Sequence, residues 1–176
     1  MAIDRQKTET VHWHAVFTAS RAEKKVRDRL EELGVECFLP VQTVLRQWTY
    51  RKSRVVVPVI AGLVFVRVGR QEQVKVLQTK GVVAFLRLKG EAGAAVIPDK
   101  QMDDFRFLLD FSEEAVEMTN ENIKAGDLVR VVKGSLRGME GELIRHKGVT
   151  KVLVRIDMLG CAMVNIPASF VEKLNK

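Results

Sequence analysis

Strand-like and helix-like hydrophobic periods alternate along residues 13–111. Residues 13–19 place apolar side chains on both faces, which is typical of a central strand covered on both sides. Residues 22–33 repeat apolar side chains at spacings of four, four and three, which predicts an amphipathic helix. Further strand patterns occupy residues 44–50, 55–59, 63–68 and 82–88, and further helix patterns occupy residues 71–79 and 99–111. The economical arrangement is an α+β fold, an antiparallel-type sheet with helices packed on it.

Local signals mark the ends of the first helix. Ser20 and Glu23 have the spacing of a capping box, which predicts Ser20 as the N-cap. Gly34 follows the last apolar position and is a natural C-terminal stop. Arg21 and Lys24 lie roughly opposite the apolar stripe, so the solvent side of this helix is predicted to be basic.

The second half of the chain has a different pattern. Residues 112–124 are polar and acidic without strong periodicity, which indicates a linker. From Gly126 onward, short valine-rich strands are predicted at residues 128–132, 140–146, 150–156 and 162–166. A small closed barrel would leave no edge strand exposed. We therefore expect one domain over residues 11–111, a linker over 112–124 and a second domain over 125–176.

Composition limits the classes of partner and compartment. The 176 residues suffice for one or two domains, and the net charge of +7 with a pI near 9.6 favours polyanionic partners, nucleic acid first. The plainer alternative is a basic but ordinary soluble protein. Cys37 and Cys161 lie far apart and belong to no disulfide or zinc pattern. The polar start of the chain is not a signal peptide, and no apolar run has the length of a membrane span, so we expect a cytoplasmic protein without a membrane partner.

Catalytic and metal-binding patterns are weak. His12 and His14 share one strand face and could pair on a metal, but no third ligand follows at a sensible spacing. Asp103 and Asp104 are adjacent on a predicted helix and point about 100° apart, which suits a solvated face better than acid–base work. The sequence contains neither a nucleophile elbow nor a phosphate-binding loop. We therefore expect no catalytic residue, metal or cofactor.

The predicted hairpin over residues 44–59 interleaves cations with aromatic rings. Cations can follow the phosphates of single-stranded nucleic acid while rings stack on its bases. The alternative is that Trp48 and Tyr50 pack on a sheet face and the cations form ordinary surface. Residues 51–54 are expected to form the turn. With the first helix included, the candidate nucleic-acid-binding residues are Arg21, Lys24, Arg27, Arg46, Arg51 and Lys52.

Two parts of the chain resemble parts of a known family. The glycine-punctuated stretch Gly126–Leu143 resembles a KOW motif, and residues 13–111 resemble the N-terminal domain of NusG-type transcription elongation factors. The second resemblance rests on Trp13-His14-Ala15-Val16, Glu23-Lys24-Lys25-Val26, Leu39-Pro40, Ala61-Gly62-Leu63-Val64-Phe65-Val66, Gly81-Val82-Val83-Ala84-Phe85 and Ile97-Pro98-Asp99. The resemblance implies a NusG N-terminal fold followed by a small SH3-like β-barrel.

The same resemblance implies partners. The first domain would dock on the clamp helices of the RNA polymerase largest subunit, a helix-in-groove contact through Trp13, Ile60, Leu63 and Phe65. The start of the first helix would face upstream DNA and the non-template strand. The barrel would recruit ribosomal protein S10 or the termination factor Rho through the loop with Met158 and Leu159. The factor would act as a monomer.

Departures from the family pattern favour a specialised member. Ala61-Gly62-Leu63 stands where the family has Pro-Gly-Tyr, and Gly134-Ser135-Leu136 stands where it has Gly-Pro-Phe. The first helix continues through residues 34–40 without the insertion common in housekeeping members. These features resemble the RfaH and UpxY type, antiterminators that act on particular operons. The alternatives are a housekeeping NusG and a ribosome-associated or RNA-binding KOW protein. One such paralog refolds its KOW domain as helices, but the valine-rich strands favour a stable barrel here.

Overall fold

The computed structural model describes residues 10–174, and these divide into two compact units. Unit 1 comprises the chain up to Leu39 together with Gly62–Val96. Unit 2 comprises Pro40–Ala61 together with the chain from Ile97 onward. This division differs from the expected boundaries, because the segments 40–61 and 97–111 group with the C-terminal part. The polar start of the chain lies outside the described residues.

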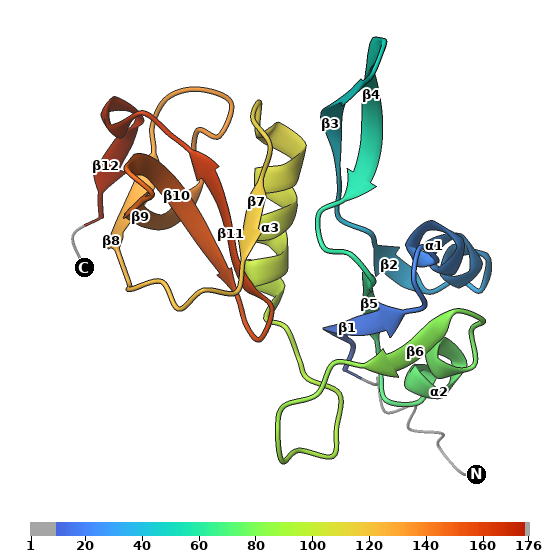
Figure 1. The fold of residues 1–176 in the computed structure, drawn as a ribbon. Coiled ribbons are helices and arrows are strands. Elements are labelled where there is room, and N and C mark those ends of the chain that lie inside the picture. Colours follow the sequence, from blue (N-terminus) through green and yellow to red (C-terminus); the bar gives the residue numbers. More distant parts are fainter. Residues whose placement is uncertain (1–9, 175–176) are drawn as a thin grey trace. The chain divides into compact units, whose positions relative to one another are not determined.

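Unit 1 is a four-stranded antiparallel sheet with two helices (Figure 1). Its strands, in the order β2-β5-β1-β6, are β2 (Glu36–Phe38), β5 (Leu63–Val68), β1 (His12–Thr18) and β6 (Val82–Phe85). Its helices are α1 (Glu23–Glu32) and α2 (Glu72–Leu77). The predicted strands at 13–19 and 63–68 and the predicted helices at 22–33 and 71–79 are confirmed within one to two residues, whereas β6 ends earlier than predicted.

The register of the sheet sorts its apolar side chains into two faces. Val16 pairs with Val64, and Cys37 pairs with Val66, so these four side chains share one face. Helix α1 lies on this face, because the Cys37 thiol donates to the carbonyl oxygen of Arg27 in α1 at 3.7 Å. The other face carries Trp13, Ala15, Phe17, Leu63 and Phe65. Apolar residues on both faces explain why β1 and β5 read as central strands.

Helix α1 begins differently from the prediction. Its N-cap is Ala22, and no side chain caps it, so the capping box of Ser20 and Glu23 is wrong. The Glu23 carboxylate is buried and accepts a hydrogen bond from the backbone N–H of Gly62 at 2.7 Å. Gly62 has a φ of +72°, a conformation that favours glycine, at the bend before β5. Glu23 therefore joins the start of α1 to the start of β5.

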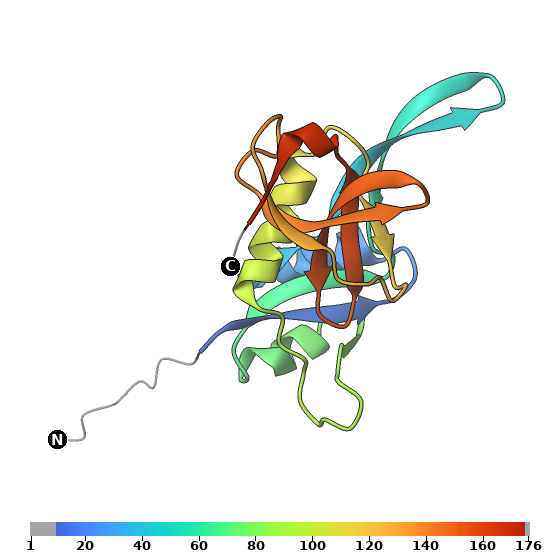
Figure 2. The ribbon, with the colours of Figure 1, turned by 90° about the vertical axis from the view of Figure 1, so that its left-hand side faces the viewer.

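Unit 2 contains a hairpin, a helix and a larger antiparallel sheet (Figures 1 and 2). The hairpin pairs β3 (Val41–Trp48) with β4 (Arg51–Pro58), and the helix is α3 (Asp99–Phe111). The sheet has the order β12-β8-β9-β10-β11-β7. Its strands are β7 (Glu117–Thr119), β8 (Asp127–Val131), β9 (Glu140–His146), β10 (Val149–Ile156), β11 (Gly160–Asn165) and β12 (Val171–Lys173), with a 3-10 turn at Ala168–Phe170.

In the hydrogen-bonded pairs of the described residues the ladder ends at β12 and at β7, so strand pairing does not show the closure expected of a barrel. Strands β8 to β11 confirm the four predicted strands within one to two residues. Helix α3 packs against β10, and the Gln101 side chain accepts a hydrogen bond from the Asp157 N–H at 2.8 Å. Helix α3 begins at Asp99 as predicted, with Pro98 as its N-cap.

The segment predicted as a linker is part of unit 2. Its strand β7 pairs with β11, and the side chain of Gln42 both donates to and accepts from the backbone of Val116. The Glu117 carboxylate accepts a hydrogen bond from the buried Lys151 ammonium at 2.6 Å. These contacts involve residues far away in sequence, so composition alone did not reveal them.

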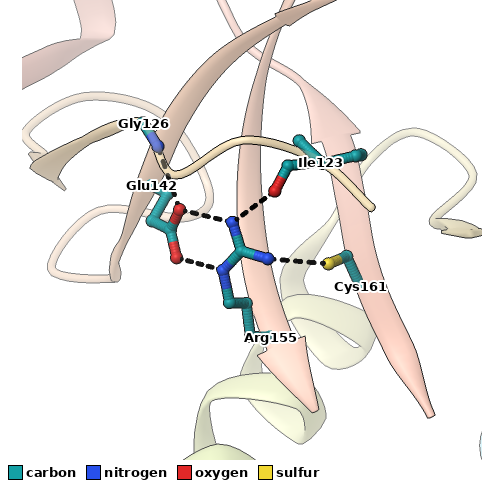
Figure 3. A network of polar contacts seen from close by, with 5 residues as sticks. All are labelled: Ile123, Gly126, Glu142, Arg155 and Cys161. Atoms are coloured by element: carbon teal, nitrogen blue, oxygen red, sulfur yellow. Dashed lines mark hydrogen bonds and ion pairs between the residues drawn. The ribbon is translucent and has the colours of Figure 1, made fainter. Parts of the chain in front are cut away.

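A polar network fastens the end of this segment to the sheet (Figure 3). The Arg155 guanidinium donates to both oxygens of Glu142, at 2.6 and 2.9 Å, and to the carbonyl oxygen of Ile123 at 3.0 Å. A further donor of Arg155 lies 3.7 Å from the sulfur of Cys161. The hydrogen bonds from Arg155 lower the pKa of Glu142, and the Gly126 N–H adds to this effect at 3.0 Å. The Glu142–Arg155 pair therefore fixes the backbone of Ile123 and Gly126, just before β8.

Candidate functional site

The β3–β4 hairpin carries exposed aromatic rings at its tip. The side chain of Tyr50 is 98% exposed and that of Trp48 is 58% exposed. The alternative in which these two rings pack on a sheet face therefore does not match the structure. The turn consists of Thr49 and Tyr50, so the predicted basic turn at residues 51–54 is wrong and belongs to strand β4.

The hairpin also carries cations, and no carboxylate lies in its own sequence to neutralise them. Residues 41–58 include four cationic side chains and no Asp or Glu. These cations are Arg46, Arg51, Lys52 and Arg54. Within the described part of the chain, no ion pair joins any of them. By contrast, Arg27, Lys100 and Arg155 all lie in ion pairs.

Strand pairing decides which cations lie beside the indole ring. Trp48 pairs with Arg51 across the hairpin, and Arg46 lies two residues before Trp48 on the same strand. These three side chains therefore share one face. Lys52 pairs with Gln47 and lies on the opposite face. Two of the predicted nucleic-acid-binding cations thus flank an exposed ring, and the third does not.

The predicted cations of the first helix differ in their exposure and in their ion pairs. Arg21 and Lys24 are exposed at its start. Arg21 has a φ of +58°, unusual for a residue with a side chain. The Arg27 guanidinium donates to the Asp28 carboxylate at 2.6 Å, which raises the pKa of Arg27 and offsets its charge locally. Arg21 is thus better placed than Arg27 to meet a polyanion, and Lys24 is exposed beside it.

Three of the four residues predicted to meet RNA polymerase share one face of the unit 1 sheet. Trp13, Leu63 and Phe65 lie on this face, with exposures of 3%, 2% and 0%. The fourth, Ile60, is half-buried and belongs to unit 2. Phe17 pairs with Leu63 on the same face and is 41% exposed. Phe17 was not singled out in the sequence, although its strand position marks it as part of this face.

The loop predicted to meet a recruited factor is a tight turn between β10 and β11. Met158 has a φ of +66° and is partly exposed, and Leu159 is half-buried. The N–H of Leu159 donates to the carbonyl oxygen of Ile156 at 3.0 Å. With Asp157 held by Gln101, the loop has a defined shape that presents Met158.

The residues considered for catalysis or metal binding make contacts that stabilise the fold. His14 is buried, its Nδ1 lies 2.8 Å from the carbonyl oxygen of Ala95, and burial lowers its pKa. Asp104 forms an ion pair with Lys100 at 2.8 Å. Within residues 10–174, no group of three His, Cys, Asp or Glu side chains could hold a metal ion. None of the helices in this part of the chain combines the length and the apolar character that a bilayer crossing requires.

These features define a basic α/β protein whose notable surfaces suit binding to a polyanion. A family model described as "Transcription termination factor nusG" matches residues 11–106, more than half of the chain. The chain therefore belongs to the NusG family of transcription factors.

One solved structure supports the fold, and a second is similar only more weakly. A structure titled "Domain interaction in Thermotoga maritima NusG" is similar with a TM-score of 0.50 and 22% identity, covering 94% of this chain and 98% of that one. A structure titled "Crystal Structure of MjSpt4:Spt5 complex conformation B" has a TM-score of 0.31 and 16% identity, covering 93% of this chain and 97% of that one. Among curated proteins, no significant match to this chain was found.

Proposed function

We propose that this chain binds RNA polymerase at the clamp helices and suppresses pausing or termination. The observation that carries the proposal is the exposed ring of Phe17, which lies at the end of an apolar sheet face whose other side chains, Trp13, Leu63 and Phe65, are buried in this structure. An apolar sheet face can receive a helix from a partner. Binding that favours the active state of the polymerase shifts its populations, and this needs no chemistry by the factor.

The cations at the start of α1 supply a second contact in this proposal. Arg21 and Lys24 would meet the non-template DNA strand and upstream DNA, with Arg27 contributing less because Asp28 pairs with it. The loop with Met158 and Leu159 would receive ribosomal protein S10 or Rho.

Within this function, we propose a specialised antiterminator of the RfaH or UpxY kind rather than a housekeeping NusG. The short path from α1 to β2 supports this choice: Gly34 and Val35 alone separate the C-cap Leu33 from Glu36. A ribosome-associated or RNA-binding KOW protein is less well supported, because Arg130 of β8, a cation that such a protein would use on RNA, forms an ion pair with Glu140 at 2.6 Å.

The test is co-elution of the full chain with core RNA polymerase, followed by pause lifetimes on a defined template. Phe17→Glu and Ile60→Glu are expected to abolish co-elution, because a buried carboxylate opposes docking on an apolar surface. Val83→Glu, which alters an exposed valine on β6, is the matched control and should retain it. Co-elution that survives Phe17→Glu and Ile60→Glu would move the docking site elsewhere. Binding to ribosomes or RNA without binding to polymerase would overturn the proposed function.

Pausing and termination on several operons separate the specialised factor from the housekeeping one. A specialised antiterminator should act only on templates that carry a particular upstream element. An equal effect on all templates, with stimulation of Rho, would identify the housekeeping alternative.

A further inference from the structure

We propose that the tip of the β3–β4 hairpin is a binding site for single-stranded nucleic acid, in which Trp48 and Tyr50 stack on unpaired bases. The site deepens the proposed function by assigning a nucleic-acid contact to the hairpin, but it does not depend on polymerase binding. Its elements are the two exposed rings and the cations Arg46 and Arg51 on the face of Trp48.

The residues of the turn are the first argument. A two-residue hairpin loop favours Gly, Asn or Asp, because its preferred turn types need a positive φ. Here Thr49 and Tyr50 occupy the loop, and neither has a positive φ. Tyr50 therefore offers no advantage to the turn. A ring that is 98% exposed also adds nothing to a core. Its side chain is available for contact with a ligand.

Charge selects the class of ligand. Within residues 10–174 the hairpin forms a two-stranded sheet of its own, and such a sheet could also accept a polypeptide strand. Four cations without a carboxylate in residues 41–58 favour a polyanion over a polypeptide strand. Elsewhere, Arg27, Arg67, Arg130 and Arg155 each pair with a carboxylate, whereas residues 41–58 contain no carboxylate at all.

The exposed rings select single strands over duplexes. Bases in a duplex present only their edges, whereas unpaired bases present a π-face that an aromatic side chain can cover. Trp48 lies directly across the hairpin from Arg51, so a base stacked on the indole would have its phosphate near a guanidinium. Single-stranded DNA and RNA both offer unpaired bases and phosphates, so both suit this site. Parallel titrations compare the two.

Intrinsic fluorescence makes the site observable in the native chain. The protein contains two tryptophans, Trp13 and Trp48, and Trp13 is buried. Titration with oligothymidylate of about 12 nucleotides, a length within the range of known single-strand sites, should quench the emission of Trp48. Parallel titrations use the matching oligouridylate and a DNA duplex. We expect both single strands to bind with higher affinity than the duplex.

Substitutions test each part of the site. The double variant Trp48→Ala/Tyr50→Ala should bind single strands at least about fivefold more weakly. Fluorescence anisotropy of a labelled oligonucleotide measures this affinity. Trp48→Phe with Tyr50→Phe should restore most of the affinity, because the rings remain. Arg51→Ala should lower the slope of log affinity against log salt by about 0.7, the value for one phosphate contact in a single strand. Lys89→Ala, an exposed cation outside the hairpin, should leave that slope unchanged.

Three results would overturn the proposal: equal binding of duplex and single strand, full affinity in the double alanine variant, or no affinity for either single strand. Circular dichroism of each variant must match the parent chain, and the phenylalanine pair distinguishes lost stacking from lost folding. Polymerase co-elution is measured separately. A chain that binds polymerase but no oligonucleotide would refute only the hairpin site.

Discussion

The Glu23 carboxylate accepts a hydrogen bond from the N–H of Gly62 at 2.7 Å, across 39 residues of chain. The carbonyl oxygen of the same Gly62 accepts a hydrogen bond from the Thr18 N–H at 2.9 Å. One bend before β5 is therefore tied both to the end of β1 and to the start of α1. This places Arg21 and Lys24 next to an anchored corner of unit 1.

Removing this anchor should destabilise the protein. Glu23→Ala leaves the Gly62 N–H without its partner, and we expect a loss of about 1–3 kcal/mol in the free energy of unfolding. Glu23→Gln keeps an acceptor and should cost less. Urea denaturation measures both variants. The control is Glu31→Ala, an exposed residue of the same helix, which should change stability by under about 0.5 kcal/mol. Equal stability of Glu23→Ala and the parent would contradict the role of this bond.

Close backbone approach makes one glycine of unit 2 irreplaceable. A Cβ on Gly126 would overlap the carbonyl oxygen of Leu143, which is backbone and has no rotamer to change. We expect Gly126→Ala to lower the free energy of unfolding by about 1–3 kcal/mol through overpacking. Gly93→Ala is the matched control, because Gly93 has open space around its Cβ position and no positive φ. Thermal denaturation compares the two, and similar melting temperatures would count against the close approach.

The Glu142–Arg155 pair should make stability fall in acid. The pKa of Glu142 is lowered below its ordinary value of 4.5, chiefly by the hydrogen bonds from Arg155. A group with a lowered folded-state pKa contributes stability above its unfolded-state pKa and loses it as the pH falls through the folded value. Glu142→Gln should therefore be less stable than the parent at neutral pH, and the difference should shrink below about pH 4. Urea midpoints across pH measure it. A difference that does not vary with pH would refute the electrostatic role.

Losing one partner of the Lys151–Glu117 ion pair should cost more stability than losing the other. Glu117→Gln leaves the ammonium group without its charge partner and should cost about 2 kcal/mol. Lys151→Met removes the buried charge itself and should cost less, because no uncompensated ion remains. Chemical denaturation of both variants and of the exposed control Glu113→Gln provides the comparison. Equal costs for the two substitutions would show that the ion pair is not what matters.

The free thiols should react slowly in the folded protein. Burial, with a smaller contribution from Glu31, raises the pKa of Cys37 from 9.0 to about 11. This shift lowers the thiolate fraction near neutral pH about a hundredfold. Burial raises the pKa of Cys161 as well. Reaction with a disulfide reagent should be slow in buffer and fast in urea. Fast modification of Cys37 in the native protein would contradict the burial of its thiol.

Several local structures could be predicted from periodicity alone. Strands β1 and β5 and helices α1 and α3 follow from apolar spacing, since each of these elements buries one or both faces. The hairpin was also predicted, and its cations and rings were singled out as a nucleic-acid candidate. The turn was misplaced, because the basic residues at positions 51–54 resemble a loop by polarity although they pair as a strand.

Other errors come from contacts between distant residues. The segment 112–124 looks like a linker because its own composition is polar, yet β7 completes a ladder with β11 and Glu117 reaches Lys151. The exposure of Phe17 beside the buried Leu63 likewise depends on strand register and packing, which the alternation of a single strand does not specify.

The sequence by itself determined the NusG family, the helices and the longer strands, and the concentration of positive charge on the hairpin and the first helix, because these depend on residue type and local spacing. Only the tertiary structure decided that Arg27 pairs with Asp28, which apolar side chains are buried, and what the Glu23 carboxylate binds. Hydrogen bonds, ion pairs and burial depend on residues brought together from distant parts of the chain. Tyr50 at the tip and Glu23 at the corner show the difference: the first was recognisable as a candidate, and the second was assigned to the wrong partner until the fold was known.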